Sequence, residues 1–231
     1  MSTPDLHLQT LFVLNDDGRI ASTREPGAHP GPLFCLVRGS TSCSWAIRAD
    51  VPVAVASEID GLAREEPPAV DLRNSPVHAS RYLALLRGRP GATQIAQSAG
   101  PAFTFPVDIE EPVGIVFVDD ERLLDHNFRG WVPGEIAFGR APVAAVTMDG
   151  HPVSVCFSAR SSDTAAEAGV ETAERFRGRG LAARVTAAWA LAIRASGRIP
   201  LYSTSWTNSP SLAVARKLHL IAYASAWSLS D

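Results

Sequence analysis

A short segment rich in glycine and arginine, residues 175–182, separates a β-rich stretch from a long helical pattern and most constrains the fold. It reads Arg-Phe-Arg-Gly-Arg-Gly-Leu-Ala, with the two glycines two positions apart. Glycine lacks a Cβ, so a ligand can approach the main-chain N–H groups closely. The first N–H groups of the helix that follows are unpaired and carry partial positive charge. Together with three arginines, this arrangement predicts an anion site and favours a pyrophosphate.

The charge distribution along the chain supports an anionic ligand. Residues 175–231 contain eight basic side chains and one acidic side chain, Asp231, whereas the rest of the chain contains 23 acidic and 13 basic side chains. The net charge of −3 therefore hides a basic C-terminal quarter. A slightly acidic chain with a short, glycine-interrupted basic cluster is not typical of nucleic-acid-binding proteins, so we expect no nucleic-acid partner.

Length and composition describe a chain without membrane spans or a disulfide framework. Its 231 residues suffice for one large domain or two small ones. No apolar run approaches the ~18 residues needed to cross a bilayer, and no signal peptide is visible. The three cysteines, Cys35, Cys43 and Cys156, are scattered, and no metal-ligand spacing occurs. We expect a cytoplasmic protein without a metal or a membrane partner, in which buried free thiols are favoured over a Cys35–Cys43 pair.

The first half of the chain, residues 1–112, predicts a small α+β region. Short apolar runs bounded by Gly, Pro, Asp and Ser predict strands, and two longer patterns predict helices. The strands are expected at 8–15, 33–38 and 44–48, and the helices at 53–64 and 76–86. Residues 94–105 predict a hairpin that turns at Gly100-Pro101.

The second half, residues 113–231, has a clearer order of elements. Strands are expected at 113–118, 142–148, 152–160, 166–173, 199–206 and 220–229, and helices at 119–128, 181–196 and 208–219. Asp149-Gly150 predicts a type I′ hairpin turn, and Gly197 suits the end of the long helix. This order predicts a mixed α/β fold in which helices flank one central sheet.

The residues on these elements resemble a known family. They are the strand end Val170-Glu171-Thr172, the loop 175–182, and the segment Asn208-x-x-Ser211-x-x-Val214-Ala215-x-Lys217-Leu218. In this order and spacing they are similar to the GCN5-related N-acetyltransferases (GNAT). The resemblance covers residues 113–231 and is strongest from Glu167 onward. Residues 1–112 match no family that we can name, and we expect either a degenerate second copy of the fold or a lid.

The resemblance implies a GNAT-like fold for residues 113–231 and acetyl-CoA as the co-substrate. In that family two neighbouring strands separate, and the pantetheine arm lies between them; here these strands hold Val170–Thr172 and residues 199–206. Main-chain groups of Val170 and Thr172 would hold the arm, with Asn208 and Ser211 beside it. The pyrophosphate would be held by the loop, which consists of Arg175, Phe176, Arg177, Gly178, Arg179, Gly180, Leu181 and Ala182.

The resemblance also implies transfer of an acetyl group to the amine of a small molecule by direct attack on the thioester. Glu171 is the first candidate for the base or amine-binding group, and Glu167 is the second. Strand alternation places both carboxylates on the same face of their strand. The alternative for either is an ion pair with a nearby arginine such as Arg160. The acidic balance outside the C-terminal quarter weakly favours a cationic acceptor.

The proton donor for the leaving thiolate departs from the family pattern. Many members place a tyrosine seven residues after the asparagine, whereas this chain has Ala215. Tyr202 and Tyr223 lie on neighbouring predicted strands, and either is a candidate replacement, although each also suits a half-buried aromatic position.

Two other functions are considered beside acetyl transfer. Gly178-x-Gly180-x-x-Ala183 matches a dinucleotide-binding fingerprint, but that fingerprint needs an acidic residue about 20 positions later, and none occurs between Arg175 and Ser230. A non-catalytic module that binds CoA as a sensor or scaffold has Ala215 as its only support. The acceptor and the choice between monomer and homodimer stay open.

Overall fold

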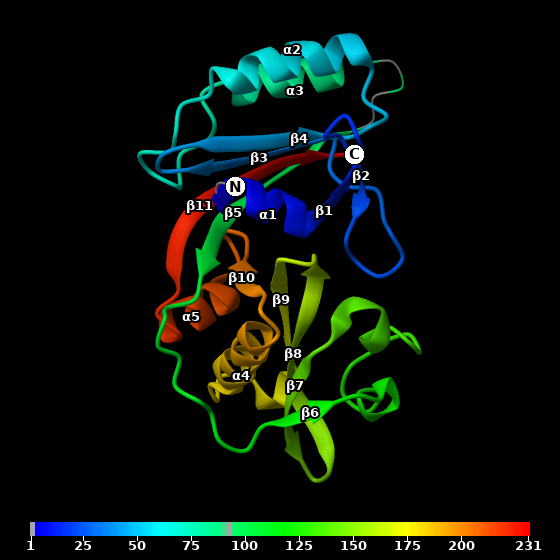
Figure 1. Ribbon diagram of the computed structural model, residues 1–231, viewed down its shortest axis with the longest axis vertical. Helices are drawn as coiled ribbons and strands as arrows, with labels where there is room; N and C mark the ends of the chain where they lie inside the picture. Colours follow the sequence, from blue (N-terminus) through cyan, green and yellow to red (C-terminus); the bar gives the residue numbers. More distant parts are fainter. Residues whose placement is uncertain (1–2, 90, 92–93) are drawn as a thin grey trace.

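A nine-stranded mixed sheet runs through the whole molecule in the computed structural model, which describes residues 3–89, 91 and 94–231 (Figure 1). The strand order is β4-β3-β11-β5-β10-β9-β8-β7-β6. The strands are β3 (Phe34–Gly39), β4 (Cys43–Ile47), β5 (Ala96–Thr104), β6 (Val116–Val118), β7 (Val143–Met148), β8 (His151–Ser161), β9 (Ala165–Thr172), β10 (Ile199–Ser203) and β11 (Ile221–Ser230). A separate hairpin is formed by β1 (Phe12–Leu14) and β2 (Ile20–Thr23). The mixed sheet with flanking helices confirms the predicted fold class.

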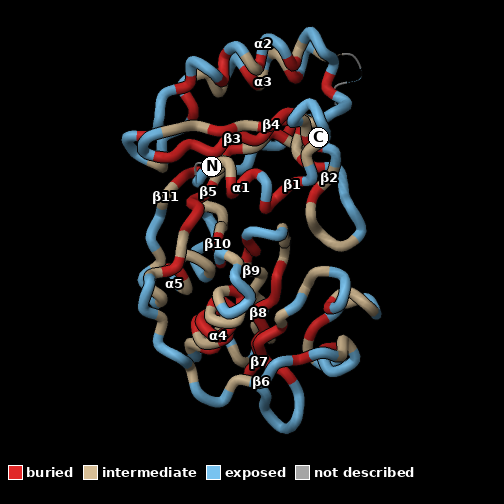
Figure 2. The backbone as a smooth tube through the Cα atoms, viewed as in Figure 1, coloured by how far each residue is buried: buried red, intermediate tan, exposed pale blue. Residues whose placement is uncertain are grey.

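Helices cover both faces of the N-terminal end of the sheet. Alternating side chains of β3 explain this, because Phe34 and Leu36 pack toward α2 (Val53–Arg64) and α3 (Ala79–Arg87). Cys35 and Val37 point to the opposite face, where they pack with residues of α1 (Thr3–Leu11). Figure 2 shows the burial that results, with buried residues along the strands and exposed residues on the outer sides of α2 and α3.

The C-terminal end of the sheet is covered by one long helix on one face and by irregular chain on the other. Helix α4 (Leu181–Ala195) buries Val185, Trp189 and Ile193, which follow the helical period, in the core shared with β7, β8, β9 and β10. Helix α5 (Ser209–Lys217) packs beside α4. The opposite face carries the 3₁₀ turn η1 (Glu121–Leu123) and the π-helical turn η2 (Ile136–Arg140), while the 3₁₀ turn η3 (Glu174–Phe176) precedes α4.

Two predictions for the N-terminal half are wrong. Residues 8–11 were expected in a strand but belong to α1, because Leu8 and Leu11 lie three positions apart and both pack against the sheet. The expected hairpin at 94–105 is the single strand β5. Gly100 is not a turn residue: a Cβ there would lie 1.7 Å from the carbonyl oxygen of Thr204, so the glycine permits close approach of two chain segments.

The predicted elements of the second half are confirmed with small differences. Asp149 and Gly150 have positive φ angles of 50° and 80°, as the predicted hairpin turn requires, and Gly197 has a φ of 80° after α4. The expected helix at 119–128 is only the turn η1, which Asp120 caps by accepting a hydrogen bond from the Arg122 N–H. The strand expected to reach residue 206 ends at Ser203.

The sheet is continuous across the expected boundary at residues 112 and 113. Strand β5, from the N-terminal part, lies between β10 and β11 of the C-terminal part and pairs antiparallel with both. The two parts therefore share one sheet, and the division into domains 1–112 and 113–231 stays a prediction. No helix in the described residues is long and apolar enough to cross a membrane. The three cysteines are free thiols, and Cys35 and Cys156 are buried.

Candidate functional site

The site begins where two parallel strands separate. Strands β9 and β10 pair at only three positions, the last of which joins Glu167 to Leu201, and beyond it β9 continues to Thr172 paired with β8 alone. The N–H of Ala173 donates to the Val153 carbonyl. Because hydrogen-bonding residues alternate along an antiparallel ladder, Val170 and Thr172 direct their main-chain groups away from β8 and into the opening.

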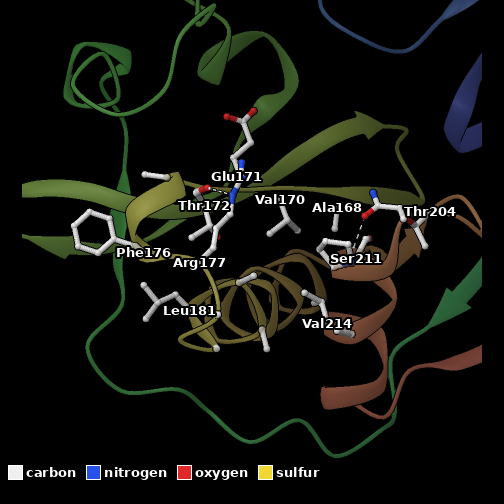
Figure 3. A pocket seen from close by; sticks show the side chains of 18 of the residues that line it. Ala168, Val170, Glu171, Thr172, Phe176, Arg177, Leu181, Thr204, Ser211 and Val214 are labelled. Atoms are coloured by element: carbon white, nitrogen blue, oxygen red, sulfur yellow. Dashed lines mark hydrogen bonds between the residues drawn. The ribbon is translucent and has the colours of Figure 1, made fainter.

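A cavity of about 1240 Å³ occupies this opening (Figure 3). Figure 3 shows Val170 and Leu181 pointing into it from β9 and α4, with Ser211 and Val214 on α5 across the gap. Most of the residues expected to bind the cofactor line it; these are Val170, Thr172, Phe176, Arg177, Gly178, Gly180, Leu181, Ala182, Asn208 and Ser211. Arg175 instead lines a smaller neighbouring cavity with His126 and Arg129, and Arg179 lines neither.

The glycine loop forms a cradle at the N-terminus of α4. Gly178 and Gly180 have φ angles of 75° and 76°, a conformation that favours glycine. Gly180 is the N-cap of α4, and no side chain among the described residues caps the helix, so its first N–H groups face the cavity without a side-chain partner there. A Cβ on Gly180 would lie 2.4 Å from the Lys217 Nζ, so the missing side chain leaves room for that ammonium group.

The loop arginines divide between two positions. Arg177 donates from Nε to the Thr172 carbonyl oxygen at 3.2 Å, which ties the loop back to the end of β9. The guanidinium groups of Arg175 and Arg179 lie 4.9 and 5.2 Å from the centre of the Phe176 ring. The loop therefore places two positive charges near the ring of Phe176, which lines the cavity.

Helix α5 contributes a polar wall to the cavity. Asn208 caps the helix, as its Oδ1 accepts a hydrogen bond from the Ser211 N–H at 3.1 Å. The hydroxyl groups of Ser211 and Tyr202 are 2.6 Å apart, and both residues line the cavity. Burial raises the pKa of Tyr202 to about 12, while the hydrogen bond to Ser211 acts in the opposite direction. Ala215, where the family pattern has a tyrosine, is buried in the core together with Tyr202.

Tyr223, the other candidate proton donor, points elsewhere. Its hydroxyl lies 2.7 Å from Nδ1 of the buried His7 on α1, and Tyr223 packs against Leu6, Ala165 and Leu201. It does not line the cavity. The structure therefore separates the two tyrosines, since only Tyr202 reaches the opening.

Glu171 lies at the edge of the opening on the sheet face away from α4. Figure 3 shows its carboxylate pointing to the opposite side of β9 from Val170 and α4. Partial burial raises the pKa of Glu171, and the positive charge of Arg140 acts in the opposite direction. The residue remains exposed and lines the cavity, so its carboxylate can meet a second ligand from this side.

Glu167, the second candidate, is buried at the point where β9 and β10 part. Its carboxylate accepts hydrogen bonds from the Arg160 Nη1 at 2.9 Å and from the Ser203 hydroxyl. Arg160 also pairs with Glu25 in the loop that follows β2. This is the ion pair with Arg160 that the sequence offered as the alternative for Glu167.

The sequence did not indicate every residue around the opening. Lys217 is the only lysine of the chain and belongs to the segment that carries the resemblance, but its place on the cavity beside Gly180 was not predicted. Asn127, Phe128 and Arg129 also line the cavity from the irregular segment between β6 and β7. The sequence predicts a helix over part of this segment, but the position of these residues on the cavity follows only from the folded chain.

Comparisons with known proteins agree with this geometry. A family model for GNAT acetyltransferases matches residues 142–222. The fold is similar to that of a GNAT family protein from Novosphingobium aromaticivorans, with 24% sequence identity, coverage of 61% of this chain and 67% of that chain, and a TM-score of 0.50.

Two further solved structures resemble longer stretches of the chain. One is a GCN5-related N-acetyltransferase-like protein from Streptococcus suis, with 17% identity, coverage of 86% of this chain and 84% of that chain, and a TM-score of 0.49. The other is a tandem GNAT protein from the clavulanic acid biosynthesis pathway, with 13% identity, coverage of 90% and 80%, and a TM-score of 0.48. No curated protein matches the chain.

The matched residues 142–222 run from the start of β7 into β11 and include the separated strands, the glycine loop, α4 and α5. In its C-terminal half, this chain carries a GNAT acetyltransferase domain.

Proposed function

We propose that this protein is an acetyl-CoA-dependent N-acetyltransferase that acts on the amine of a small molecule. The GNAT family generally uses acyl-CoA, and membership suggests an acyltransferase. The observation that carries the proposal is the joint placement of the β9–β10 opening and the glycine cradle on one cavity. One part offers main-chain groups that β8 leaves unpaired to an extended arm, and the other offers N–H groups and cations to a pyrophosphate.

The residues present fit coenzyme A. Val170 and Thr172 would hold the pantetheine arm with their main-chain groups, as in the pairing of an added strand. The first N–H groups of α4, together with Arg177 and Lys217, would hold the pyrophosphate. The cavity is large enough for such a ligand, at about 1240 Å³. When bound there, acetyl-CoA supplies the acetyl group as an activated thioester.

Glu171 acts as the base in this proposal. An attacking amine must lose a proton, and a carboxylate at the edge of the opening can accept it directly or through one water molecule. The raised pKa of Glu171 suits this role, because it brings the basicity of the carboxylate closer to neutral pH.

Tyr202 holds the proton for the leaving sulfur. Its hydroxyl lies on the α5 side of the cavity, opposite Glu171, and its high pKa keeps it protonated at neutral pH. Ser211, 2.6 Å away, fixes the direction of the hydroxyl and can return a proton to it. Glu171 and Tyr202 thus lie on opposite faces of the separated strands. Proton transfer from the amine and proton transfer to the leaving sulfur therefore take place on different sides.

The test follows release of free CoA thiol with a panel of small amines. We expect turnover by the native protein and a loss of roughly 10² to 10⁴ in kcat for Glu171→Gln, with acetyl-CoA binding unchanged. Tyr202→Phe should lower kcat roughly tenfold to hundredfold, again without weaker binding.

One outcome would favour the non-catalytic alternative, which rests on the alanine at position 215. If acetyl-CoA binds but no amine in the panel releases thiol, the protein is a CoA-binding sensor or scaffold. Turnover that Glu171→Gln leaves intact would remove Glu171 from the chemistry and leave the acetyltransferase class in place.

A further inference from the structure

Arg140, at the end of η2, is held on the sheet face that carries Glu171. Its guanidinium carbon lies 4.9 Å from the centre of the Phe157 ring and 5.7 Å from that of Trp131. The two rings contact each other edge to face, with centroids 4.9 Å apart. An arginine packed over two aromatic rings loses little further freedom when it binds a ligand, so its guanidinium is already oriented.

This guanidinium group has few polar partners. Its one ion-pair contact is with Glu135, at 3.6 Å from Nε, which is longer than a hydrogen bond. Nε is buried and has no hydrogen-bond partner, and no side-chain hydrogen bond of Arg140 is found within residues 3–89, 91 and 94–231. A guanidinium carries five N–H donors, and leaving such donors unpaired and partly buried is costly. Glu135 supplies a charge but no hydrogen bond, so the guanidinium keeps its donors for a further anionic partner such as a ligand carboxylate.

The position of Phe157 brings Arg140 close to Glu171. In the β8–β9 ladder, Phe157 lies opposite Gly169, two residues before Glu171 and on the same face. A Cβ on Gly169 would lie 2.5 Å from the Phe157 ring, so the glycine lets this ring lie flat over β9. Arg140 is close enough for its charge to lower the pKa of Glu171 against the effect of burial. A cation and a carboxylate therefore flank the place from which an amine would approach.

We propose that the acceptor is an α-amino acid, whose carboxylate binds Arg140 while its amine faces Glu171. This inference rests on the proposed acetyltransferase function and names its substrate class. A planar guanidinium binds a carboxylate through two parallel hydrogen bonds. A simple amine has no carboxylate and cannot form this pair. Free α-amino acids carry a cationic and an anionic group close together, which suits a site with a carboxylate and a guanidinium on one sheet face, and the rings of Phe157 and Trp131 lie beside the guanidinium.

The experiment compares matched acceptors that differ only in the carboxylate. Phenylalanine is set against phenethylamine, leucine against isopentylamine, and phenylalanine against phenylalanine amide, all with acetyl-CoA and at one pH. The amide is the strictest control, because its amine is less basic and more of it is neutral, so without carboxylate recognition the amide reacts faster. We expect kcat/KM for each free amino acid to exceed that of its partner by roughly tenfold or more.

Variants at position 140 link the preference to this side chain. Arg140→Met keeps an unbranched side chain over the rings and removes the charge. Arg140→Lys keeps the charge and removes the planar guanidinium that forms two parallel hydrogen bonds. Both should lower kcat/KM for phenylalanine by roughly tenfold to hundredfold, mainly through KM, and change that for phenethylamine less than about threefold. Arg122→Gln is the matched control, because Arg122 lies on the same segment, pairs with Asp120 and with no other side chain in the described part of the protein, and is 84% exposed.

The outcomes separate this inference from the function on which it rests. Acetylation of amines and amino acids at similar rates, or equal losses for both in Arg140→Met, would overturn the amino-acid assignment and leave the acetyltransferase function intact. Absence of turnover with every acceptor, in a protein whose circular dichroism melt is normal, would overturn both.

Discussion

The two ends of the sheet differ in how far their strands stay paired. At the N-terminal end, β11 pairs with β5 from Ile221 to Ser230 and with β3 from Ala224 to Leu229, and apolar side chains fill the space beneath α2 and α3. At the C-terminal end, β9 and β10 pair at three positions and then separate. The ligand site therefore arises from interrupted pairing, which exposes main-chain groups that a closed sheet uses internally.

The closed end still contributes to the open one. Strand β5 holds β10 in place from the side opposite β9, and Glu25 pairs with the arginine that contacts the buried Glu167. We therefore interpret residues 1–112 as support for the opening, and the following predictions test this division of roles.

The largest effect is expected for Gly100→Ala in β5. The new Cβ would meet the Thr204 carbonyl oxygen at 1.7 Å, so β5 and the chain after β10 must move apart, at a cost of about 3 kcal/mol in unfolding free energy. Gly61→Ala is the control, because Gly61 lies in α2 with open space around it and should stabilise the protein by about 0.5–1 kcal/mol. Chemical denaturation of both variants measures the difference. Equal stabilities would show that β5 does not hold β10 closely.

The two carboxylates of β9 should differ in the property they affect. Glu167→Gln replaces an anionic partner of Arg160 with a neutral one in a buried site and should lower the unfolding free energy by about 2 kcal/mol. Glu171→Gln changes an exposed side chain and should alter stability by less than about 0.5 kcal/mol while lowering kcat. Thermal melts and initial rates on the same samples test this. A Glu167→Gln variant with native stability and a low kcat would assign the catalytic role to Glu167 and contradict its role in stability.

A third comparison uses two glycines at opposite ends of α4. Gly180→Ala and Gly197→Ala both force a side chain into a positive φ, of 76° and 80°, and should each lose about 1 kcal/mol of stability. Only Gly180 adjoins the cavity and Lys217, so only Gly180→Ala should raise the Kd for acetyl-CoA, on the order of tenfold. Isothermal titration calorimetry separates them, and equal affinities would place the cofactor away from the loop.

The smallest effect concerns pH. Glu171 must be ionised to accept a proton, so kcat/KM should rise with pH through an apparent pKa above the ordinary value of a glutamate. Because the charge of Arg140 lowers the pKa of Glu171, Arg140→Gln should move this rise to higher pH by less than about one unit. Rate profiles with phenethylamine, which has no carboxylate, measure the shift. A shift of the rise to lower pH would contradict the influence of Arg140 on the pKa of Glu171.

The C-terminal elements were predictable because local signals agree with the tertiary structure there. The apolar period of α4, the Asp149-Gly150 turn and the glycine at position 197 after α4 each follow from residues close in sequence. Gly100 shows the opposite case, because the Gly-Pro pair predicts a turn, whereas the folded chain needs the glycine for contact with Thr204, about a hundred residues later.

The candidate site was likewise predictable only in part. The cradle and the strand end carry a sequence pattern, and the structure gathers most of their residues on one cavity. Arg140, Lys217 and the pairing of Tyr202 with Ser211 depend on elements that meet only in the folded chain. A sequence without alignment gives no signal for such long-range contacts.

Calorimetric titration of the native protein with acetyl-CoA tests the central claim most directly. The opening between β9 and β10, with the cradle at Gly178 and Gly180, predicts saturable binding of one acetyl-CoA per chain and a higher Tm in its presence. Absence of binding heat and of any rise in Tm at millimolar acetyl-CoA would contradict the assignment of this cavity.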